Sequence, residues 1–216
     1  HTAPANTAPA NDEIWYTNGR TTEPTAPYNP DAFGSATIQS NTYDAEKECW
    51  VIKFDKDLTE IGDSAFWNCD SLTSVTIGNS VTTIGKWAFD DCSSLTSVTI
   101  GNSVTTIGEY AFGYCESLAS VTIPDSVTEI RHMAFSYCHS LKTVYCKPTT
   151  PPTGDYDMFD NNAAGRKIYV PAESVVAYKE AYGWSVYKDY IFAEGVESES
   201  ANDEIWYTNG RTTGPT

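Results

Sequence analysis

The chain has 216 residues, of which 29 are acidic and 13 basic, giving a formal net charge of −16. Hydrophobic residues make up 40% and aromatic residues 13%, which is enough to bury a core and excludes a disordered chain by composition. A strongly negative surface repels phosphate backbones and anionic lipid, and the sequence has no run of about 18 apolar residues, so we expect neither nucleic acid as a partner nor membrane insertion.

Residues 1–10, HTAPANTAPA, are expected to form a linker. They contain neither Met nor an apolar signal stretch, as in a processed piece of a longer precursor. The next twelve residues, NDEIWYTNGRTT, recur letter for letter at 202–213. In the first copy, EIWYT runs into Asn18-Gly19, a strong turn signal for a β-hairpin. We therefore predict an N-terminal β-hairpin cap over residues 11–34.

The central part of the chain is an internal repeat. Four units of 23 residues are clear, at 58–80, 81–103, 104–126 and 127–149. In the second unit the recurring apolar positions are Ile84, Ala88, Phe89, Cys92, Leu95, Val98 and Ile100. Degenerate units extend the repeat to 35–57 and 150–173. A fixed apolar set at constant spacing indicates one unit stacked on copies of itself, so we predict an α/β solenoid of about six rungs over residues 35–173.

Within each unit, LTSVTI alternates apolar and small polar residues and is rich in β-branched residues, which predicts a short strand. Equivalent strands of successive units then lie side by side and parallel, about 4.8 Å apart. The stretch IGKWAFDDC is too short for a long helix, and we expect one or two helical or 3₁₀ turns there. In the opening unit, Ile52 and Phe54 form the inward pair, and Cys49 takes the core place of Leu72.

Both ends of such a stack expose apolar faces that must be covered. The segment after Pro171 carries Val175, Val176 and Tyr178 or Lys179 at helical spacing. We therefore assign residues 174–195 to a C-terminal helical cap, and residues 196–216 to a linker and the start of a second module copy. Because the copies at 11–22 and 202–213 are identical, strand exchange and self-association between molecules is one hypothesis. A chain boundary without functional meaning is compatible with the interpretation as the start of a second module in a tandem array.

The repeat pattern, I-x3-AF-x2-C-x2-L-x2-V-x-I-[GP], resembles the BspA-like leucine-rich repeats of surface proteins from Bacteroides-type bacteria. The module ends, EIWYTNG before the repeats and RKIYVP with AYKEAYGW after them, are also similar to those of such proteins. The resemblance implies a right-handed leucine-rich-repeat solenoid with a parallel β-sheet on its concave face. It also implies an extracellular or cell-surface location and adhesion to host matrix proteins or other cells, and it carries over no catalytic residue.

The cysteines suggest packing rather than chemistry. Cys69, Cys92, Cys115 and Cys138 recur at the same corner of successive units, where parallel side chains hold their Cβ atoms farther apart than a disulfide allows. We predict a column of buried thiols. His132 and His139 lie near Cys138 in sequence, but Cys138 belongs to the column and His139 is expected to point outward. We expect no metal, no cofactor and no catalytic residue, and hence no enzyme.

Candidate binding residues stand at outward positions. Rows of Ser and Thr keep the outward face of the sheet hydrated. Near the C-terminal end these rows are interrupted by Lys142, Tyr145, Lys167 and Tyr169, whose aromatic and basic side chains are favoured in binding interfaces. A second set lies on the turns beside each AF pair, namely Trp87, Tyr110, Tyr114 and Tyr137, although these rings also suit packing between rungs. We predict a non-enzymatic module for protein–protein adhesion. The alternatives are a structural spacer in a tandem surface array and a carbohydrate-binding module.

Overall fold

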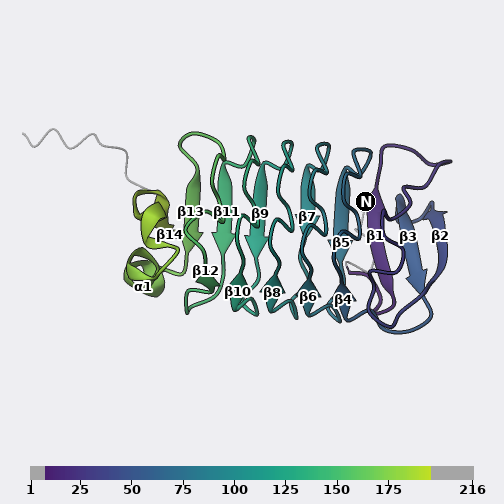
Figure 1. Ribbon diagram of the computed structural model, residues 1–216, viewed down its shortest axis with the longest axis horizontal. Helices are drawn as coiled ribbons and strands as arrows, with labels where there is room; N and C mark the ends of the chain where they lie inside the picture. Colours follow the sequence, from purple (N-terminus) through teal and green to yellow (C-terminus); the bar gives the residue numbers. More distant parts are fainter. Residues whose placement is uncertain (1–7, 196–216) are drawn as a thin grey trace, which may run out of the picture.

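The computed structural model describes residues 8–195, which form an elongated stack of repeats with a cap at each end (Figure 1). One edge of each repeat is a short strand: β5 (Ser74–Ile77), β7 (Ser97–Thr99), β9 (Ser120–Ile123), β11 (Thr143–Cys146) and β13 (Lys167–Val170). Except between β7 and β9, neighbours pair in parallel with equivalent residues opposite, such as Val75 with Val98 and Val121 with Val144. This confirms the predicted strands. Among residues 8–195, no helix is long and apolar enough to cross a bilayer.

A second parallel ladder runs along the opposite edge of the stack (Figure 1). Its members are two-residue strands, namely β4 (Glu60–Ile61), β6 (Thr83–Ile84), β8 (Thr106–Ile107), β10 (Glu129–Ile130) and β12 (Thr153–Gly154). In β4, β6, β8 and β10 the second residue is an isoleucine whose side chain is fully buried. Each of these repeats therefore contributes one inward side chain and one backbone pairing to this ladder. The sequence pattern did not predict this ladder, because two residues are too few to show alternation.

The expected helical turns around each AF pair are wrong. The structure has turns there, with two left-handed residues in each clear repeat, such as Trp87 (φ 56°) and Asp91 (φ 59°). Phe89 N, between them, donates to Ala111 O of the next repeat at 2.8 Å. Ala88 N and Asp90 N make longer bonds within the turn, of 3.4 Å to Gly85 O and 3.3 Å to Trp87 O. The chain therefore gains hydrogen bonds along the stack by accepting backbone strain of about 1–2 kcal/mol at a left-handed residue.

The core is a column of stacked side chains. Phe66, Phe89, Phe112, Phe135 and Phe159 follow one another with ring centroids 5.1, 5.2, 5.2 and 5.6 Å apart. Beside them run the predicted free thiols, all buried. Three of these thiols also contact the preceding repeat: Cys92 Sγ donates to Phe66 O at 3.1 Å, Cys115 Sγ to Phe89 O at 3.2 Å and Cys138 Sγ to Phe112 O at 3.1 Å.

The N-terminal end differs from the prediction. Its strands are β1 (Glu13–Thr17), β2 (Ile38–Asp44) and β3 (Cys49–Phe54). No strand returns from Asn18-Gly19 among residues 20–34, so the predicted hairpin is wrong, and the hairpin is formed by β2 and β3 instead. β1 lies antiparallel between β3 and β5, with Ile14 opposite both Ile52 and Ile77. Hence β3 does not pair directly with β5, as an ordinary opening rung would.

This arrangement also moves Cys49 out of the predicted core column. Cys49 packs with Trp15 and Val51 in a small separate cluster on the outer side of the sheet, whereas Ile52 and Phe54 are buried in the main core as expected. The side chains of a strand alternate between two faces, and residue 49 shares its face with residue 51 rather than with residue 52.

The C-terminal end is closed by a short helical cap. It consists of the 3₁₀ helices η1 (Ala172–Ser174) and η2 (Ser185–Tyr190) around the helix α1 (Val175–Glu180). Tyr178 and Trp184 are fully buried against the last repeat, but Val176, predicted to face inward, is 66% exposed. The chain then adds an unexpected strand, β14 (Ile191–Ala193), which pairs in parallel with β13.

The main ladder is interrupted once. β7 belongs to the sheet with β5 and β1, whereas β9 belongs to the sheet with β11, β13 and β14. At the end of β9, Pro124 occupies the position held by Gly101 one repeat earlier and by Lys147 one repeat later. Lys147 N donates to Ile123 O at 3.0 Å, a bond that Pro124 has no N–H to make with Ile100. Gly101 itself packs so closely on Gly78 that a Cβ there would lie 2.2 Å from Gly78 O.

Candidate binding surfaces

The outward side of the C-terminal strands carries a row of aromatic rings. Tyr145 on β11 lies opposite Tyr169 on β13, which lies opposite Phe192 on β14. The two tyrosine rings stack with centroids 5.4 Å apart and planes 19° apart, and Phe192 lies 6.3 Å beyond Tyr169. We call Tyr145, Tyr169 and Phe192 the aromatic row. Adjacent parallel strands place these rings side by side because their registers match.

Two lysines lie over rings of the aromatic row. Lys147 Nζ lies 5.6 Å from the centroid of Tyr145, and Lys167 Nζ lies 5.7 Å from that of Phe192, both within cation–π range. Lys147 also forms an ion pair with Glu194. Lys142 and Lys167 are exposed and make no ion pair within residues 8–195. In a chain with 16 excess negative charges, this is a locally basic and aromatic surface.

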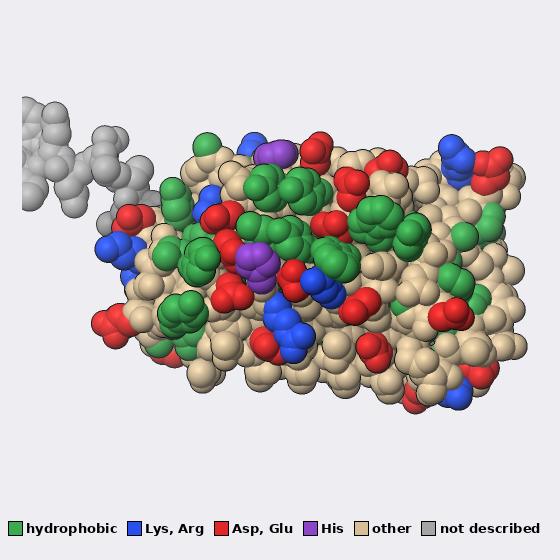
Figure 2. All heavy atoms as spheres, in the orientation of Figure 1, with side chains coloured by type: hydrophobic (Ala, Val, Ile, Leu, Met, Phe, Trp, Pro, Cys, Tyr) green, Lys and Arg blue, Asp and Glu red, His purple; other side chains and the backbone are tan. Residues whose placement is uncertain are grey.

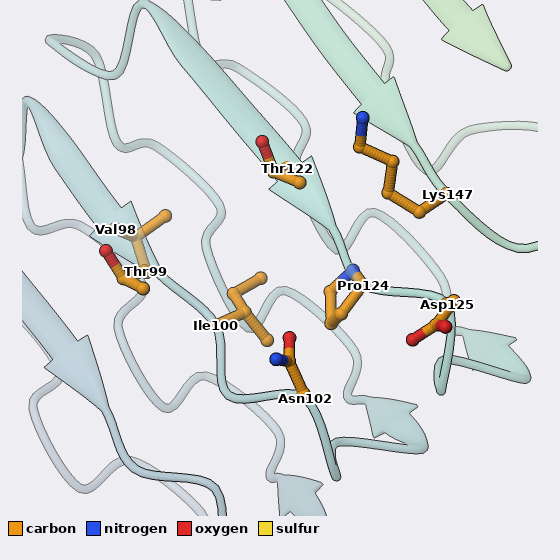
Figure 3. Close-up of a pocket in the computed structure, with 8 residues that line it drawn as sticks. All are labelled: Val98, Thr99, Ile100, Asn102, Thr122, Pro124, Asp125 and Lys147. Atoms are coloured by element: carbon orange, nitrogen blue, oxygen red, sulfur yellow. The ribbon is translucent and has the colours of Figure 1, made fainter. Parts of the chain in front are cut away.

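A hollow adjoins the row where the ladder is interrupted (Figure 3). It has a volume of about 790 Å³. Eight residues from the ends of β7, β9 and β11 line it, namely Val98, Thr99, Ile100, Asn102, Thr122, Pro124, Asp125 and Lys147. Thr122 lies directly opposite Tyr145 in the sheet register, so the hollow and the aromatic row form one continuous surface.

The second predicted set of aromatics lies on the turns around the AF pairs, which we call the turn face. Tyr114 and Tyr137 stack with centroids 4.5 Å apart, Tyr110 contacts His132, and Lys86 Nζ lies 4.0 Å above Trp87. Figure 2 shows hydrophobic side chains in rows along this face, with acidic groups and two histidines between them. These aromatic side chains therefore differ in exposure. Trp87 and Tyr114 are about two-fifths exposed, whereas Tyr110 and Tyr137 are half-buried.

Trp87 also borders an open pocket at the N-terminal part of the turn face. Its other lining residues are Tyr28, Ser64 and Trp67, and its volume is about 430 Å³. Tyr28 and Trp67 meet edge to face at 4.9 Å. This pocket was not predicted, because Tyr28 belongs to the long segment before the repeats and its position relative to Trp67 depends on the fold.

The carboxylate of Asp90, in one of these turns, is buried. Asp90 is 9% exposed, and its Oδ1 has no hydrogen-bond partner among the described residues. Burial raises the pKa of Asp90 to about 6. A Cβ at Gly113, the equivalent residue of the next repeat, would lie 2.5 Å from that oxygen. The small residue in one repeat therefore makes room for the acidic side chain of the previous one.

His132, Asp155 and Asp157 form the one group within residues 8–195 whose nitrogen and carboxylate atoms are close enough, within 4.8 Å of one another, to share a metal ion. Asp157 is 3% exposed. Both of its oxygens already have partners, since Oδ2 lies 2.8 Å from His132 Nδ1 and Oδ1 accepts from Met133 N at 3.3 Å. The cluster therefore ties two repeats together. Cys138 and His139 are not part of it.

The eight predicted binding residues thus divide between two surfaces. On the sheet, Tyr145, Tyr169 and Lys167 belong to one cluster with Phe192, and Lys142 stands exposed at the start of β11. The turn face carries the other four, Trp87, Tyr110, Tyr114 and Tyr137, in three successive repeats. The sequence missed Phe192 and Lys147, which complete the sheet cluster. Alternation of inward and outward residues along Ile191–Ala193 would have predicted an outward Phe192 on a strand. Three residues are too few for such a pattern to be recognised.

Comparisons with solved structures give partial similarity. A leucine-rich repeat protein of T. pallidum is 31% identical over 54% of this chain and 53% of that chain, with a TM-score of 0.49. A leucine-rich cell surface protein from Faecalibacterium prausnitzii is 28% identical over 53% of this chain and 30% of that chain, with a TM-score of 0.48. The chain thus spans about half of the first protein and less than a third of the second.

A leucine-rich repeat protein from Bacteroides capillosus is 29% identical over 64% of this chain and 96% of that chain, with a TM-score of 0.41. No curated protein matches the sequence. Residues 36–173, well over half of the chain, match the family model of the BspA type leucine-rich repeat region in six copies. The chain belongs to the BspA-type leucine-rich repeat family.

Proposed function

We propose that this chain is a non-enzymatic module of a bacterial cell-surface protein and that it binds a protein partner through the aromatic row and the adjoining hollow. The observation that carries the proposal is the stacking of Tyr145 on Tyr169, with Phe192 beside them and lysines around them. Rigid aromatic rings present contact area at little conformational cost, and tyrosine is among the residues that contribute most to the energetics of protein interfaces. The lysines add a local positive charge that complements an acidic partner.

The charge of the surface suggests the kind of partner. Lys147 and Lys167 lie over rings of the row, and Lys142 is exposed just before β11, although the whole chain is strongly acidic. An acidic segment of an extracellular protein, such as a host matrix protein or the surface of another cell, suits this local field. Several modules in one surface protein would increase the avidity of a weak single site.

The test is equilibrium binding of the chain to immobilised matrix glycoproteins, as a monomer and as an enforced multimer, before and after removal of their glycans. Saturable binding that survives deglycosylation supports the proposal. Replacing Tyr145 and Tyr169 with Ser should then weaken binding about tenfold or more. Tyr182→Ser is the matched control, because Tyr182 is 74% exposed on the C-terminal cap and should leave binding unchanged. Binding that the double replacement does not affect would contradict the proposed surface.

Carbohydrate binding is the second candidate, and the pocket of Tyr28, Trp67 and Trp87 favours it. Exposed indole rings stack on sugar faces, and carboxylates nearby accept hydrogen bonds from hydroxyl groups. In the same assay, loss of binding on deglycosylation, together with loss in Trp87→Ala but not in Tyr145→Ser, would favour this function. No binding in either format would leave the structural spacer as the remaining explanation.

A further inference from the structure

β1 occupies a slot between two strands that are much later in the sequence. Ile14 lies opposite Ile52 of β3 on one side and Ile77 of β5 on the other, and both flanking strands run antiparallel to β1. Ile14 and Tyr16 are buried in the main core. Without β1, the edge of β5 and the edge of β3 would both be left unpaired, so the N-terminal end of the stack is incomplete without this strand.

The slot recognises the side chains of its strand as well as its backbone. Tyr16 Oη accepts from Thr25 N at 2.9 Å and donates to Asn41 Oδ1 at 2.8 Å. Thr17 Oγ1 lies 2.6 Å from Ser74 Oγ. Asn18 continues the pattern beyond the strand, because its Oδ1 accepts from Trp50 Nε1 at 3.1 Å. A strand of different sequence would leave several of these buried groups without partners.

The three side chains that make these contacts from β1 and its continuation, Tyr16, Thr17 and Asn18, each have a second copy in the chain. The segment Asn202 to Thr213 repeats Asn11 to Thr22 residue for residue, and it lies outside the described residues. We propose that the slot between β3 and β5 is a binding site for residues 204–208 of a second copy of this chain, so that molecules join head to tail by strand exchange. The proposal is independent of the partner-binding function proposed above.

Chain length favours exchange between molecules over closure within one. From β14, the last described strand, six strand spacings of about 4.8 Å lead to β1, or about 29 Å along the stack. Eight residues lie between Gly195 and Glu204, and the nine steps from one Cα to the next span about 30 Å when fully extended. Closure within one molecule would therefore need a straight, fully stretched path with no detour around the C-terminal cap. A neighbouring molecule imposes no such limit.

The resident strand competes with the incoming one. Both have the same sequence, but β1 is tethered next to the slot at an effective concentration of about millimolar. Exchange should therefore be rare in dilute solutions of the unaltered chain and should dominate when β1 is weakened. Since the donor segment and the slot are different surfaces, the contact is heterologous. It forms a closed ring or reciprocal dimer where the rotation between neighbours closes, and an open chain of molecules where it does not.

Two matched replacements separate the copies. Ile14→Asp puts a carboxylate at a fully buried position of β1, and Ile205→Asp makes the same change in the second copy. We expect Ile14→Asp to form concentration-dependent oligomers by light scattering, with a Tm that rises with protein concentration. Ile205→Asp should remain a monomer with an unchanged Tm. The protein with both replacements should be a monomer with the lowest Tm.

A synthetic peptide of sequence NDEIWYTNGRTT gives the second readout. Added to the protein with both replacements, it should raise the Tm in a saturable way, whereas the peptide with Asp in place of Ile should have no effect. The proposal is overturned if Ile14→Asp and the double replacement have the same mass and Tm at every concentration and the peptide stabilises neither. That result is independent of whether the chain binds matrix proteins, so the two proposals fail separately.

Discussion

The ring of Tyr145 lies on that of Tyr169, with centroids 5.4 Å apart and planes 19° from parallel. Because the rings belong to adjacent strands in register, their contact should stabilise the C-terminal repeats as well as present a surface. In a double-mutant cycle of Tyr145→Ala and Tyr169→Ala, we expect a coupling of about 0.5–1.5 kcal/mol in the free energy of unfolding. Urea denaturation measures it. Tyr145 paired with the distant Tyr182 should show no coupling, and equal values for both pairs would contradict a direct contact.

Asp90 should make the stability depend on pH. Burial raises its pKa from 3.8 to about 6, so the folded protein holds a proton between those values that the unfolded chain has lost. This contribution to the free energy of unfolding therefore decreases as the pH rises from about 4 to about 6. We expect Asp90→Asn to remove this slope and to be more stable at pH 7 by about 1–2 kcal/mol. Unfolding from pH 4 to pH 8 measures it.

The control for that prediction is Asp189→Asn, since Asp189 is exposed on the C-terminal cap. It should leave the pH profile unchanged. If the profiles of Asp90→Asn and of the unaltered protein run parallel between pH 4 and pH 6, Asp90 does not carry the raised pKa.

The left-handed turns should reverse the usual preference for Ala over Gly. Asp91 has φ 59° and is exposed, so its backbone conformation can be tested with little change in packing. We expect Asp91→Gly to be more stable than Asp91→Ala by about 1–2 kcal/mol, because a Cβ is unfavourable in this conformation. Thermal or urea unfolding of the two proteins gives the comparison. A more stable Ala protein would show that the turn relaxes to an ordinary conformation.

The thiols should differ in reactivity according to their place. Burial raises the pKa of every described cysteine side chain in the column, to about 11 for Cys69 and well above its usual range for Cys115. Cys49 lies in the outer cluster with Trp15. We expect an alkylating reagent at pH 8 to modify Cys49 first and Cys115 only after unfolding, because the thiolate is the reactive form. Mass spectrometry of digests follows each site, and equal rates at both would contradict the prediction.

Repetition explains what the sequence could predict. Residues 58–149 carry the same apolar set four times, so the strands, the phenylalanine column and the buried thiols follow from the spacing alone. The outward position of Tyr145 and Tyr169 follows in the same way, because alternation along a strand assigns each residue to a face.

The features that the sequence did not predict depend on contacts between distant segments. The insertion of β1 between β3 and β5 is decided by side chains such as Tyr16 and Asn41, which meet only in the folded protein. The burial of Asp90 depends on the lack of a side chain at Gly113 in the next repeat. The left-handed turns occur at Trp87 and Tyr110, which have no intrinsic preference for that conformation.

The interruption between β7 and β9 also has a mechanical consequence. Stacked repeats are held by interfaces between neighbours, and this interface lacks the strand pairing that joins the others in the ladder. When the two ends of the module are pulled apart, the tension should part the stack first at this junction, next to Pro124. Each half would keep its own strands of the main ladder, and in the second ladder only the β6–β8 pairing would have to break at the junction. The module would therefore lengthen in a defined step before either half unravelled.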